Sequence, residues 1–271
     1  MIADDLRQVW RTPEVQTMLR RLLAGGMFKD DPALAQLLFD AIEAGCASGR
    51  SSEGLYDDLH AVLHREENLR RFGRLFQSDE AVRIERRVRQ LVELVPPGEE
   101  PARFVDVGCG TGQVTAGLAR AWGLPPQCVV GVEVFERSLA PGAFTAVPFA
   151  GRKVPLADGS QDLATLLMVL HHETDAPGLL TEVCRVLRMR GLLLVRETDA
   201  ATPELKLFNQ VMEQFYYRVF NRLPGVPNPV THRSAVEWRK LFARAGFTIE
   251  REERPEPNNP FTPVHFVLRK R

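Results

Sequence analysis

The sequence has few cysteines and no long hydrophobic run. Its four cysteines, Cys46, Cys109, Cys128 and Cys184, form neither a CxxC pair nor another metal-like cluster. A chain of 271 residues can also build a core without disulfides. We therefore expect reduced thiols, no metal site and a cytoplasmic protein. No stretch approaches the roughly 18 apolar residues of a membrane span, and MIADDLRQVW at the N-terminus is no signal peptide, so we expect no membrane partner.

Positive and negative charges balance, with 35 lysines and arginines against 35 aspartates and glutamates. The chain therefore has no global field that would draw it to nucleic acid or to an anionic membrane. Seven arginines between residues 70 and 89 alternate with acidic residues. This alternation is more typical of a solvated, ion-paired helix surface than of an RNA-binding strip.

Residues 1–95 show helical patterns and no convincing strand. Asp31 and Pro32 predict an N-cap followed by proline at the first helical position. Ser78 predicts the cap of a later helix, and the proline-rich stretch 96–101 predicts a linker. We expect an N-terminal helical region that acts as a lid or joins two copies in a homodimer.

Beyond the linker, short apolar runs alternate with helical patterns. Strands are expected at 102–107, 128–134, 143–149, 163–170 and 192–196, with a final pair at 247–250 and 264–268. Such alternation predicts a mainly parallel sheet with helices on both faces. We expect this core domain to span 101–271, with an insertion at 202–232 whose helix begins at Thr202-Pro203.

The strongest signal is the stretch FVDVGCGTG at 104–112, where a strand leads into three glycines and then a helix. Glycines allow a tight turn and a close ligand, and a helix N-terminus offers free N–H donors. A dinucleotide fingerprint would need glycine at position 113, which is Gln113, and the Gly-Lys-Ser/Thr of a P-loop is absent. NAD and FAD are therefore disfavoured.

A carboxylate follows at the end of the next predicted strand. Glu133 ends VVGVE, 23 residues beyond Gly110. A carboxylate in this place can accept hydrogen bonds from both hydroxyls of a ribose. Together with the glycine turn it predicts an adenosine-containing ligand.

These residues resemble the class I S-adenosylmethionine-dependent methyltransferases. DVGCGTG is similar to the first motif of that family, and Glu133 matches its ribose-binding acid. The stretches 154–162, 168–172 and 182–191 resemble motifs of the UbiE-like (methyltransferase type 11) branch. The resemblance covers about 83–200 and implies a Rossmann-like seven-stranded sheet, S-adenosylmethionine as cofactor and direct in-line methyl transfer.

The resemblance also implies the residues that bind the cofactor. They are Asp106, Gly108, Cys109, Gly110, Thr111, Gly112, Glu133, Val134, Ala150 and Met168. For Asp106 the alternative is a turn cap, and Cys109 is interpreted as a small residue that fits the loop. The family's adenine-binding aspartate is replaced by Phe149-Ala150-Gly151, so backbone groups or Asp158 would have to recognise adenine.

Candidate acceptor-side residues follow the fourth and fifth predicted strands and lie in the insertion. His171 or His172 could act as general base, because histidine titrates near neutral pH, although His172 could equally be structural. Glu197 in the stretch RETD could face the acceptor or cap a turn. Tyr216 and Tyr217 could line a pocket, whereas most aromatics near them are expected in the core.

We expect a small-molecule acceptor, because the UbiE-like motifs are commonest in such enzymes and the chain is neutral. The alternative is methylation of RNA, including its cap. The sequence RETD at 196–199 and the stretch 233–238 loosely resemble a viral-type methyltransferase signature. A third possibility is a partner subunit that has lost cofactor binding, which the intact glycine motif and Glu133 argue against.

Overall fold

The computed structural model describes residues 5–134, 142–149, 153–221 and 231–271. Tertiary contacts divide the chain into two units, one of Met1–Ala81 with Ala200–His232 and one of Val82–Asp199 with Arg233–Arg271. The linker at 96–101, predicted to be the domain boundary, thus lies inside the second unit. The predicted insertion at 202–232 groups with the N-terminal helices.

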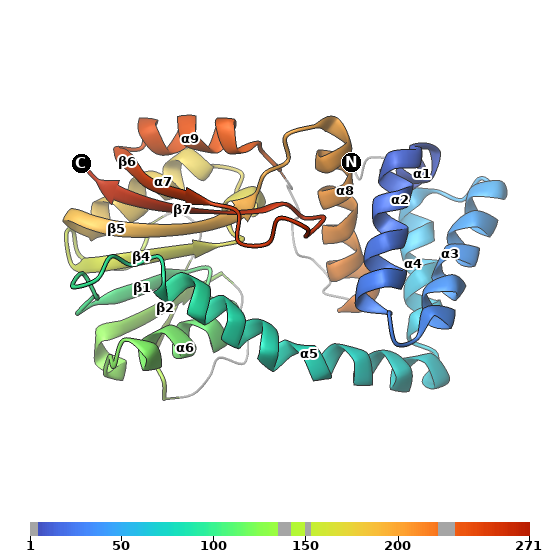
Figure 1. Cartoon of the computed structure of the whole chain (residues 1–271), viewed down its shortest axis with the longest axis horizontal. Coiled ribbons are helices and arrows are strands. Elements are labelled where there is room, and N and C mark those ends of the chain that lie inside the picture. Colours follow the sequence, from blue (N-terminus) through green and yellow to red (C-terminus); the bar gives the residue numbers. More distant parts are fainter. Residues whose placement is uncertain (1–4, 135–141, 150–152, 222–230) are drawn as a thin grey trace. The chain divides into compact units, whose positions relative to one another are not determined.

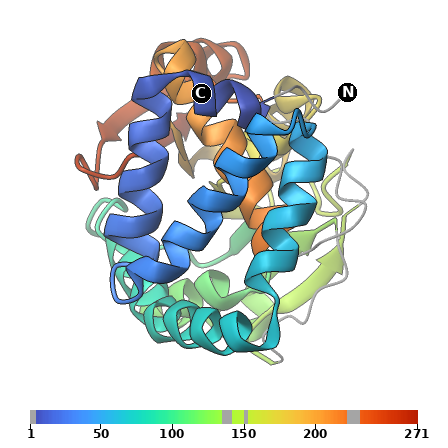
Figure 2. The same ribbon diagram turned by 90° about the vertical axis from the view of Figure 1, so that its right-hand side faces the viewer.

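The first unit consists of helices. They are α1 (Asp5–Arg11), α2 (Pro13–Leu22), the π-helical turn η1 (Leu23–Met27), α3 (Pro32–Ala47), α4 (Ser52–Leu63), the first part of α5 (Glu66–Val92), α8 (Pro203–Gln214) and the π-helical turn η4 (Phe215–Phe220). Figure 2 shows α1 to α4 side by side, and α8 contacts α1 and α2. The predicted cap at Asp31 is confirmed, since it accepts from the Leu34 N–H. The helix predicted to begin at Thr202-Pro203 is also confirmed, and Thr202 caps it by accepting from the Leu205 N–H.

Helix α5 is longer than the sequence predicted. It continues through Ser78 without a break, so the prediction that Ser78 caps a new helix is wrong. A serine caps a helix only where the preceding backbone leaves the helical conformation. No proline interrupts 66–92, and Glu66 pairs with Arg70 at the four-residue spacing that supports a helix.

The second unit holds a seven-stranded sheet of order β3-β2-β1-β4-β5-β7-β6. Its strands are β1 (Phe104–Val107), β2 (Val129–Glu133), β3 (Thr145–Pro148), β4 (Gln161–Leu167), β5 (Leu187–Thr198), β6 (Phe247–Glu253) and β7 (Pro263–Lys270). The first five strands pair in parallel, whereas β7 is antiparallel to both β5 and β6. The predicted α/β fold with a mainly parallel sheet is therefore confirmed.

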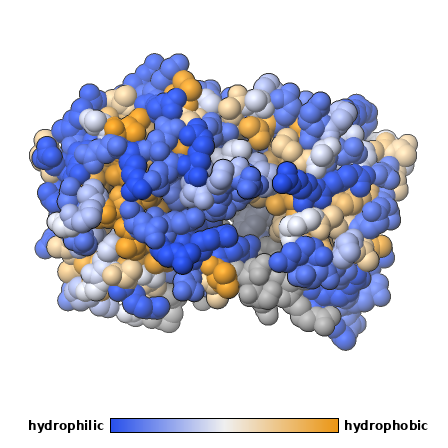
Figure 3. Space-filling view, in the orientation of Figure 1, coloured by the Kyte–Doolittle hydropathy of each residue, from blue (hydrophilic) through white to orange (hydrophobic). Residues whose placement is uncertain are grey.

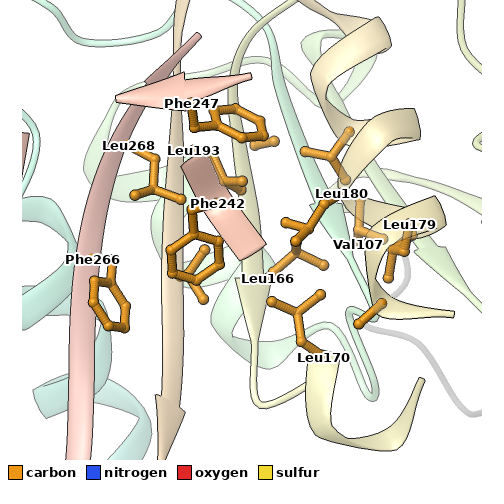
Figure 4. Close-up of a cluster of buried hydrophobic side chains, with 14 of the residues drawn as sticks. Val107, Leu166, Leu170, Leu179, Leu180, Leu193, Phe242, Phe247, Phe266 and Leu268 are labelled. Atoms are coloured by element: carbon orange, nitrogen blue, oxygen red, sulfur yellow. The ribbon is translucent and has the colours of Figure 1, made fainter. Parts of the chain in front are cut away.

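Helices cover both faces of this sheet (Figure 1). On one face, α7 (Ala176–Val186) and α9 (Ala235–Arg244) pack on a core in which Leu193, Phe242 and Phe266 take part (Figure 4). On the other face, the end of α5 and α6 (Gln113–Ala121) cover a second core that includes Leu194. Successive residues of β5 therefore point to opposite faces, as in any strand.

Exposed apolar side chains are dispersed over different elements. The larger ones are Leu37, Leu69, Val82, Val134, Met189, Tyr216 and Val236. Figure 3 shows hydrophilic residues over most of the visible surface, and single exposed apolar residues are normal in proteins. Among the described residues, no helix combines the length and apolar content needed to cross a bilayer.

Candidate active site

The glycine loop between β1 and α6 has a backbone that other residues would strain. Gly108, Gly110 and Gly112 all have positive φ, at 77°, 57° and 77°. A Cβ on Gly108 would lie 2.5 Å from Val169 Cγ2, whereas a Cβ on Gly110 would meet no atom within 4 Å. Gly108 is thus required by both conformation and space, and Gly110 by conformation. Gly112 is the N-cap of α6, so the loop leads directly into a helix N-terminus.

Glu133 lies beside this loop, as the spacing predicted. Its Oε2 accepts a hydrogen bond from the Gly110 N–H at 2.7 Å, and its Oε1 accepts from the Val134 N–H at 2.8 Å. Glu133 is half-buried at the carboxyl end of β2. A carboxylate has about four acceptor positions and can therefore accept from more than one donor. Thr111 of the loop is exposed.

Cys109 fills a small space behind the loop. It is buried, and its Sγ lies 2.9 Å from where a Cβ on Gly131 would stand. The glycine in strand β2 therefore makes room for the cysteine of the loop. This packing supports the interpretation of Cys109 as a small residue that fits.

Asp106 is buried at the end of β1 between two threonines. Its Oδ2 accepts from the Thr115 hydroxyl and its Oδ1 from the Thr165 hydroxyl, both at 2.6 Å. Burial raises the pKa of Asp106, and the two hydrogen bonds oppose that rise. The carboxylate ties β1 to α6 and β4 just before the loop. Contact with the ammonium group of a cofactor stays a prediction.

Met168 follows β4 in a strained conformation. Its φ is 61°, and its N–H donates to the Arg196 carbonyl oxygen at 2.8 Å. A methionine with left-handed backbone is uncommon, and such strain is concentrated at functional sites. The turn η3 (Leu170–His172) comes next, at the edge of the sheet where open α/β folds bind ligands.

His171 and Glu197, predicted separately, meet in the structure. His171 Nδ1 lies 2.7 Å from Glu197 Oε2, and Glu197 Oε1 accepts from the Leu170 N–H at 2.8 Å. Both side chains are fully buried. Because an ionised carboxylate only accepts, the Nδ1 nitrogen carries the proton and Nε2 is the basic nitrogen. The rings of His171 and His172 are 4.0 Å apart, and His172 is half-buried.

Tyr216 and Tyr217 lie in η4, within the first unit. Their rings contact edge to face at 5.3 Å, and Tyr216 is exposed. Their role on the acceptor side stays a prediction.

Sequence reasoning missed a basic cluster on β5 and β7. Arg196 and His265 face each other in the register of these strands, with Arg196 Nη1 2.7 Å from His265 Nε2. Arg196 Nη2 also donates to Glu256 Oε1 at 3.1 Å. Arg87, interpreted from sequence as part of a solvated surface, is half-buried near them. Only the strand order and register, which no local motif encodes, bring these residues together.

The family of the chain follows from comparison with known proteins. The model of a family described as a methyltransferase domain matches residues 78–252, more than half of the chain. The chain belongs to the class I S-adenosylmethionine-dependent methyltransferases. The matched residues include the glycine loop, Glu133, the His171–Glu197 pair and Arg196.

Two curated methyltransferases are similar in sequence. The chain is 32% identical over 138 residues to the demethylmenaquinone methyltransferase of Corynebacterium kroppenstedtii. This match covers 50% of this chain and 55% of that protein. It is 26% identical over 207 residues to the dimethylglycine N-methyltransferase of Parasynechococcus marenigrum, over 70% and 71%. The match thus spans little more than half the length of the first relative.

A solved methyltransferase shares the fold. The 1,6-didemethyltoxoflavin-N1-methyltransferase of Burkholderia thailandensis, with bound 1,6-didemethyltoxoflavin and S-adenosylhomocysteine, superposes with a TM-score of 0.51 and is 19% identical. The superposition covers 73% of this chain and 82% of that one.

In this chain, Phe149-Ala150-Gly151 stands where the family has an adenine-binding aspartate. Ala150 lies outside the described residues, and Val134 next to Glu133 is exposed. Asp158 pairs with Arg185 at 2.6 Å, and its side chain is 80% exposed. Arg185 also donates to the carbonyl oxygens of Val154 and Leu156. Asp158 thus helps to anchor this segment on α7, and recognition of adenine by it or by backbone groups stays a prediction.

Proposed function

We propose that the protein transfers a methyl group from S-adenosylmethionine to a small-molecule acceptor. The observation that carries this proposal is the Glu133 carboxylate, hydrogen-bonded to the Gly110 N–H where two neighbouring parallel strands end. A strained glycine loop, a helix N-terminus and a half-buried acid together form a site for an adenosine-containing ligand.

The residues present fit such a cofactor. The Glu133 carboxylate at the end of β2 is of the type that accepts from ribose hydroxyls, and Gly110, which has positive φ, donates its N–H to that acid. Gly108 leaves no room for a side chain beside Val169, which keeps the loop close to β4. When bound, S-adenosylmethionine supplies an electrophilic methyl group that the acceptor takes by in-line displacement. Such a reaction depends mainly on alignment and exclusion of water.

His171 is the residue that would remove a proton from the acceptor. Glu197 accepts from Nδ1–H, so Nε2 is the ring nitrogen that would act as the base. The same carboxylate accepts from the Leu170 N–H, which fixes the turn that carries the histidine. Glu197 is therefore a positioning residue, and it would also stabilise the imidazolium once the proton has moved.

The acceptors of similar proteins support a small molecule. The relatives and the solved structure are named for demethylmenaquinone, dimethylglycine and 1,6-didemethyltoxoflavin. All three are small compounds, although their chemistry differs. We infer an acceptor of this size class and propose that methylation takes place in the cytoplasm.

The first unit would serve as a lid or as a homodimer element, as the sequence suggested. Sedimentation velocity of the whole protein tests the second role. A single species with the mass of one 30.5 kDa chain at micromolar concentration would exclude the dimer.

Calorimetric titration with S-adenosylhomocysteine tests the proposed function. We expect micromolar binding by the wild type and about 10- to 150-fold weaker binding by Glu133→Ala, which corresponds to the roughly 1.5–3 kcal/mol of hydrogen bonds to a charged group. Glu85→Gln, an exposed glutamate on α5, is the matched control and should bind like wild type. Absence of binding to the folded wild type would reject the proposal and favour a partner subunit without cofactor.

Acceptor screening with tritiated S-adenosylmethionine then separates the acceptor classes. Small quinones, N-methylated glycines and azaheterocycles are tested beside capped and uncapped RNA oligonucleotides. Label transfer to RNA alone would overturn the small-molecule assignment.

A further inference from the structure

Arg196 has a buried guanidinium with incomplete hydrogen bonding. The residue is 5% exposed, and its two terminal nitrogens contact His265 and Glu256. Its Nε has no hydrogen-bond partner among the described residues. A buried N–H of a charged group is costly to leave unmatched, because the lost hydration is not replaced.

Positive charge exceeds negative charge around this group. Burial and the charge of Arg196 lower the pKa of Arg87 on α5 to about 10, and burial and the charge of Arg86 lower the pKa of Arg196. Arg86 lies 4.0 Å from Glu256, which is also the carboxylate that pairs with Arg196. Two acids, Glu256 and Glu197, thus face three arginines, while burial and the neighbouring arginines lower the pKa of His265 to about 3 and keep it neutral.

The backbone of Arg196 lies near the carboxyl edge of the sheet, where the proposed active site is. Along the carboxyl edge of the sheet, Glu133 ends β2, the glycine loop follows β1, His171 follows β4, and Arg196 lies near the end of β5. Neighbouring strands are about 4.8 Å apart, so Arg196 is about 10 Å across the sheet from the loop. Its backbone bonds to Met168, only three residues before His171.

We propose that Arg87 and Arg196 bind an anionic group of the methyl acceptor, a carboxylate or a phosphate. This inference rests on the proposed function, because it assigns the acceptor side of the same site. The planar guanidinium, with donors arranged as a fork, matches the oxygen geometry of both anions. An oxyanion would satisfy the Nε of Arg196 and balance the surplus charge. Anchored there, the acceptor would extend along the edge of the sheet toward His171.

Inorganic phosphate is a probe for this site that needs no knowledge of the acceptor. Its binding is measured by calorimetry with and without saturating S-adenosylhomocysteine, at an ionic strength held constant with NaCl. We expect saturable binding to wild type and at least about tenfold weaker binding to Arg87→Gln, because one charged donor is lost. Arg89→Gln, an exposed arginine on the same helix, is the matched control and should bind as wild type does.

The Arg196→Met/Glu256→Gln variant tests the second arginine. Removing Arg196 alone would take the nearest arginine from the Glu256 carboxylate, so both charges are removed together. Circular dichroism establishes that the double variant is folded. Loss of phosphate binding in this variant supports the proposal, and unchanged binding overturns it.

A second titration separates the acceptor's anion from the cofactor's own carboxylate. S-adenosylhomocysteine and 5′-methylthioadenosine, which lacks the amino-acid arm, are titrated into wild type and Arg87→Gln. Unchanged affinities for both support an acceptor subsite. If Arg87→Gln weakens the binding of S-adenosylhomocysteine but not of 5′-methylthioadenosine, the arginines belong to the cofactor site and the proposal is overturned. Equal phosphate binding by Arg87→Gln and Arg89→Gln would also overturn it. Phosphate binding without cofactor remains measurable even if S-adenosylhomocysteine does not bind, so the two proposals fail separately.

Discussion

Glu197 Oε2 lies 2.7 Å from His171 Nδ1, and neither side chain is exposed. Two residues that are 26 positions apart in sequence thereby form one hydrogen-bonded pair at the ends of adjacent parallel strands. The carboxylate selects the tautomer with a proton on Nδ1, which leaves Nε2 as the base. We therefore propose that Glu197 acts through His171 rather than through direct contact with the acceptor.

This pairing predicts a change of tautomer when the charge of Glu197 is removed. In Glu197→Gln we expect partial loss of the Nδ1–H form, and a methylation rate lower by about 10²–10⁴, the usual contribution of a general base. Nitrogen-15 shifts of the histidine rings report the tautomer without any acceptor. Glu85→Gln, an exposed glutamate on α5, is the matched control and should change neither the tautomer nor the rate. A wild-type His171 with its proton on Nε2 would contradict the proposed base.

Alanine at two loop glycines should have unequal effects. Gly110→Ala places a residue at positive φ, which costs about 1–2 kcal/mol of folding stability. Gly108→Ala adds a Cβ 2.5 Å from Val169 Cγ2, and overpacking costs about 1–3 kcal/mol more. Urea unfolding measures both variants. The double variant Gly108→Ala/Val169→Ala should recover part of the additional stability that Gly108→Ala loses. Equal stability of the two single variants would show that space beside Val169 is not limiting.

Features encoded by neighbouring residues could be predicted from the sequence. The N-caps at Asp31 and Thr202, the glycine loop and the position of Glu133 each depend on a few adjacent residues or on one βα unit. The Ser78 prediction failed because a capping residue needs a break before it, and α5 has none. Local chemistry alone could not show that absence.

Relationships across strands could not be predicted in the same way. The sequence identified His171 and Glu197 individually, but their contact depends on the register of β4 and β5. Arg196 opposite His265 further requires that β7 insert antiparallel between β5 and β6. Arg87 was interpreted as surface because its neighbours in sequence are charged, whereas its burial depends on how α5 packs on the sheet.

Arg190 lies in a turn within β5, and we predict that it makes the folded protein less stable than glycine would at this position. Its φ is 61°, a conformation in which glycine has no side-chain penalty. Arg190→Gly should raise the free energy of unfolding by about 0.5–1 kcal/mol, since relief of strain exceeds the added flexibility of the unfolded chain. Met189→Gly, an exposed neighbour without positive φ, is the control and should destabilise. A loss of stability in Arg190→Gly would indicate that contacts of its side chain outweigh the strain.

His265 predicts a pH dependence of stability in the second unit. Burial, Arg196 and Arg87 lower its pKa from 6.5 to about 3, so the folded protein keeps the ring neutral where the unfolded chain would protonate it. Above pH 6.5 neither state binds this proton, and stability is unaffected. As the pH falls from 6.5 toward 3 the unfolded state gains it, and the folded state is destabilised by about 2 kcal/mol at pH 5 relative to pH 7.5.

Urea unfolding at these two pH values tests this dependence. Trp122 and Trp238 both lie in the second unit, so a Trp10→Phe background makes tryptophan fluorescence specific for it. His265→Gln, whose amide oxygen can still accept from Arg196, should lose about 2 kcal/mol of the difference between pH 7.5 and pH 5. The same loss of stability with falling pH in both proteins would mean that other groups bind the proton. The buried arginines would then not control the ionisation of His265.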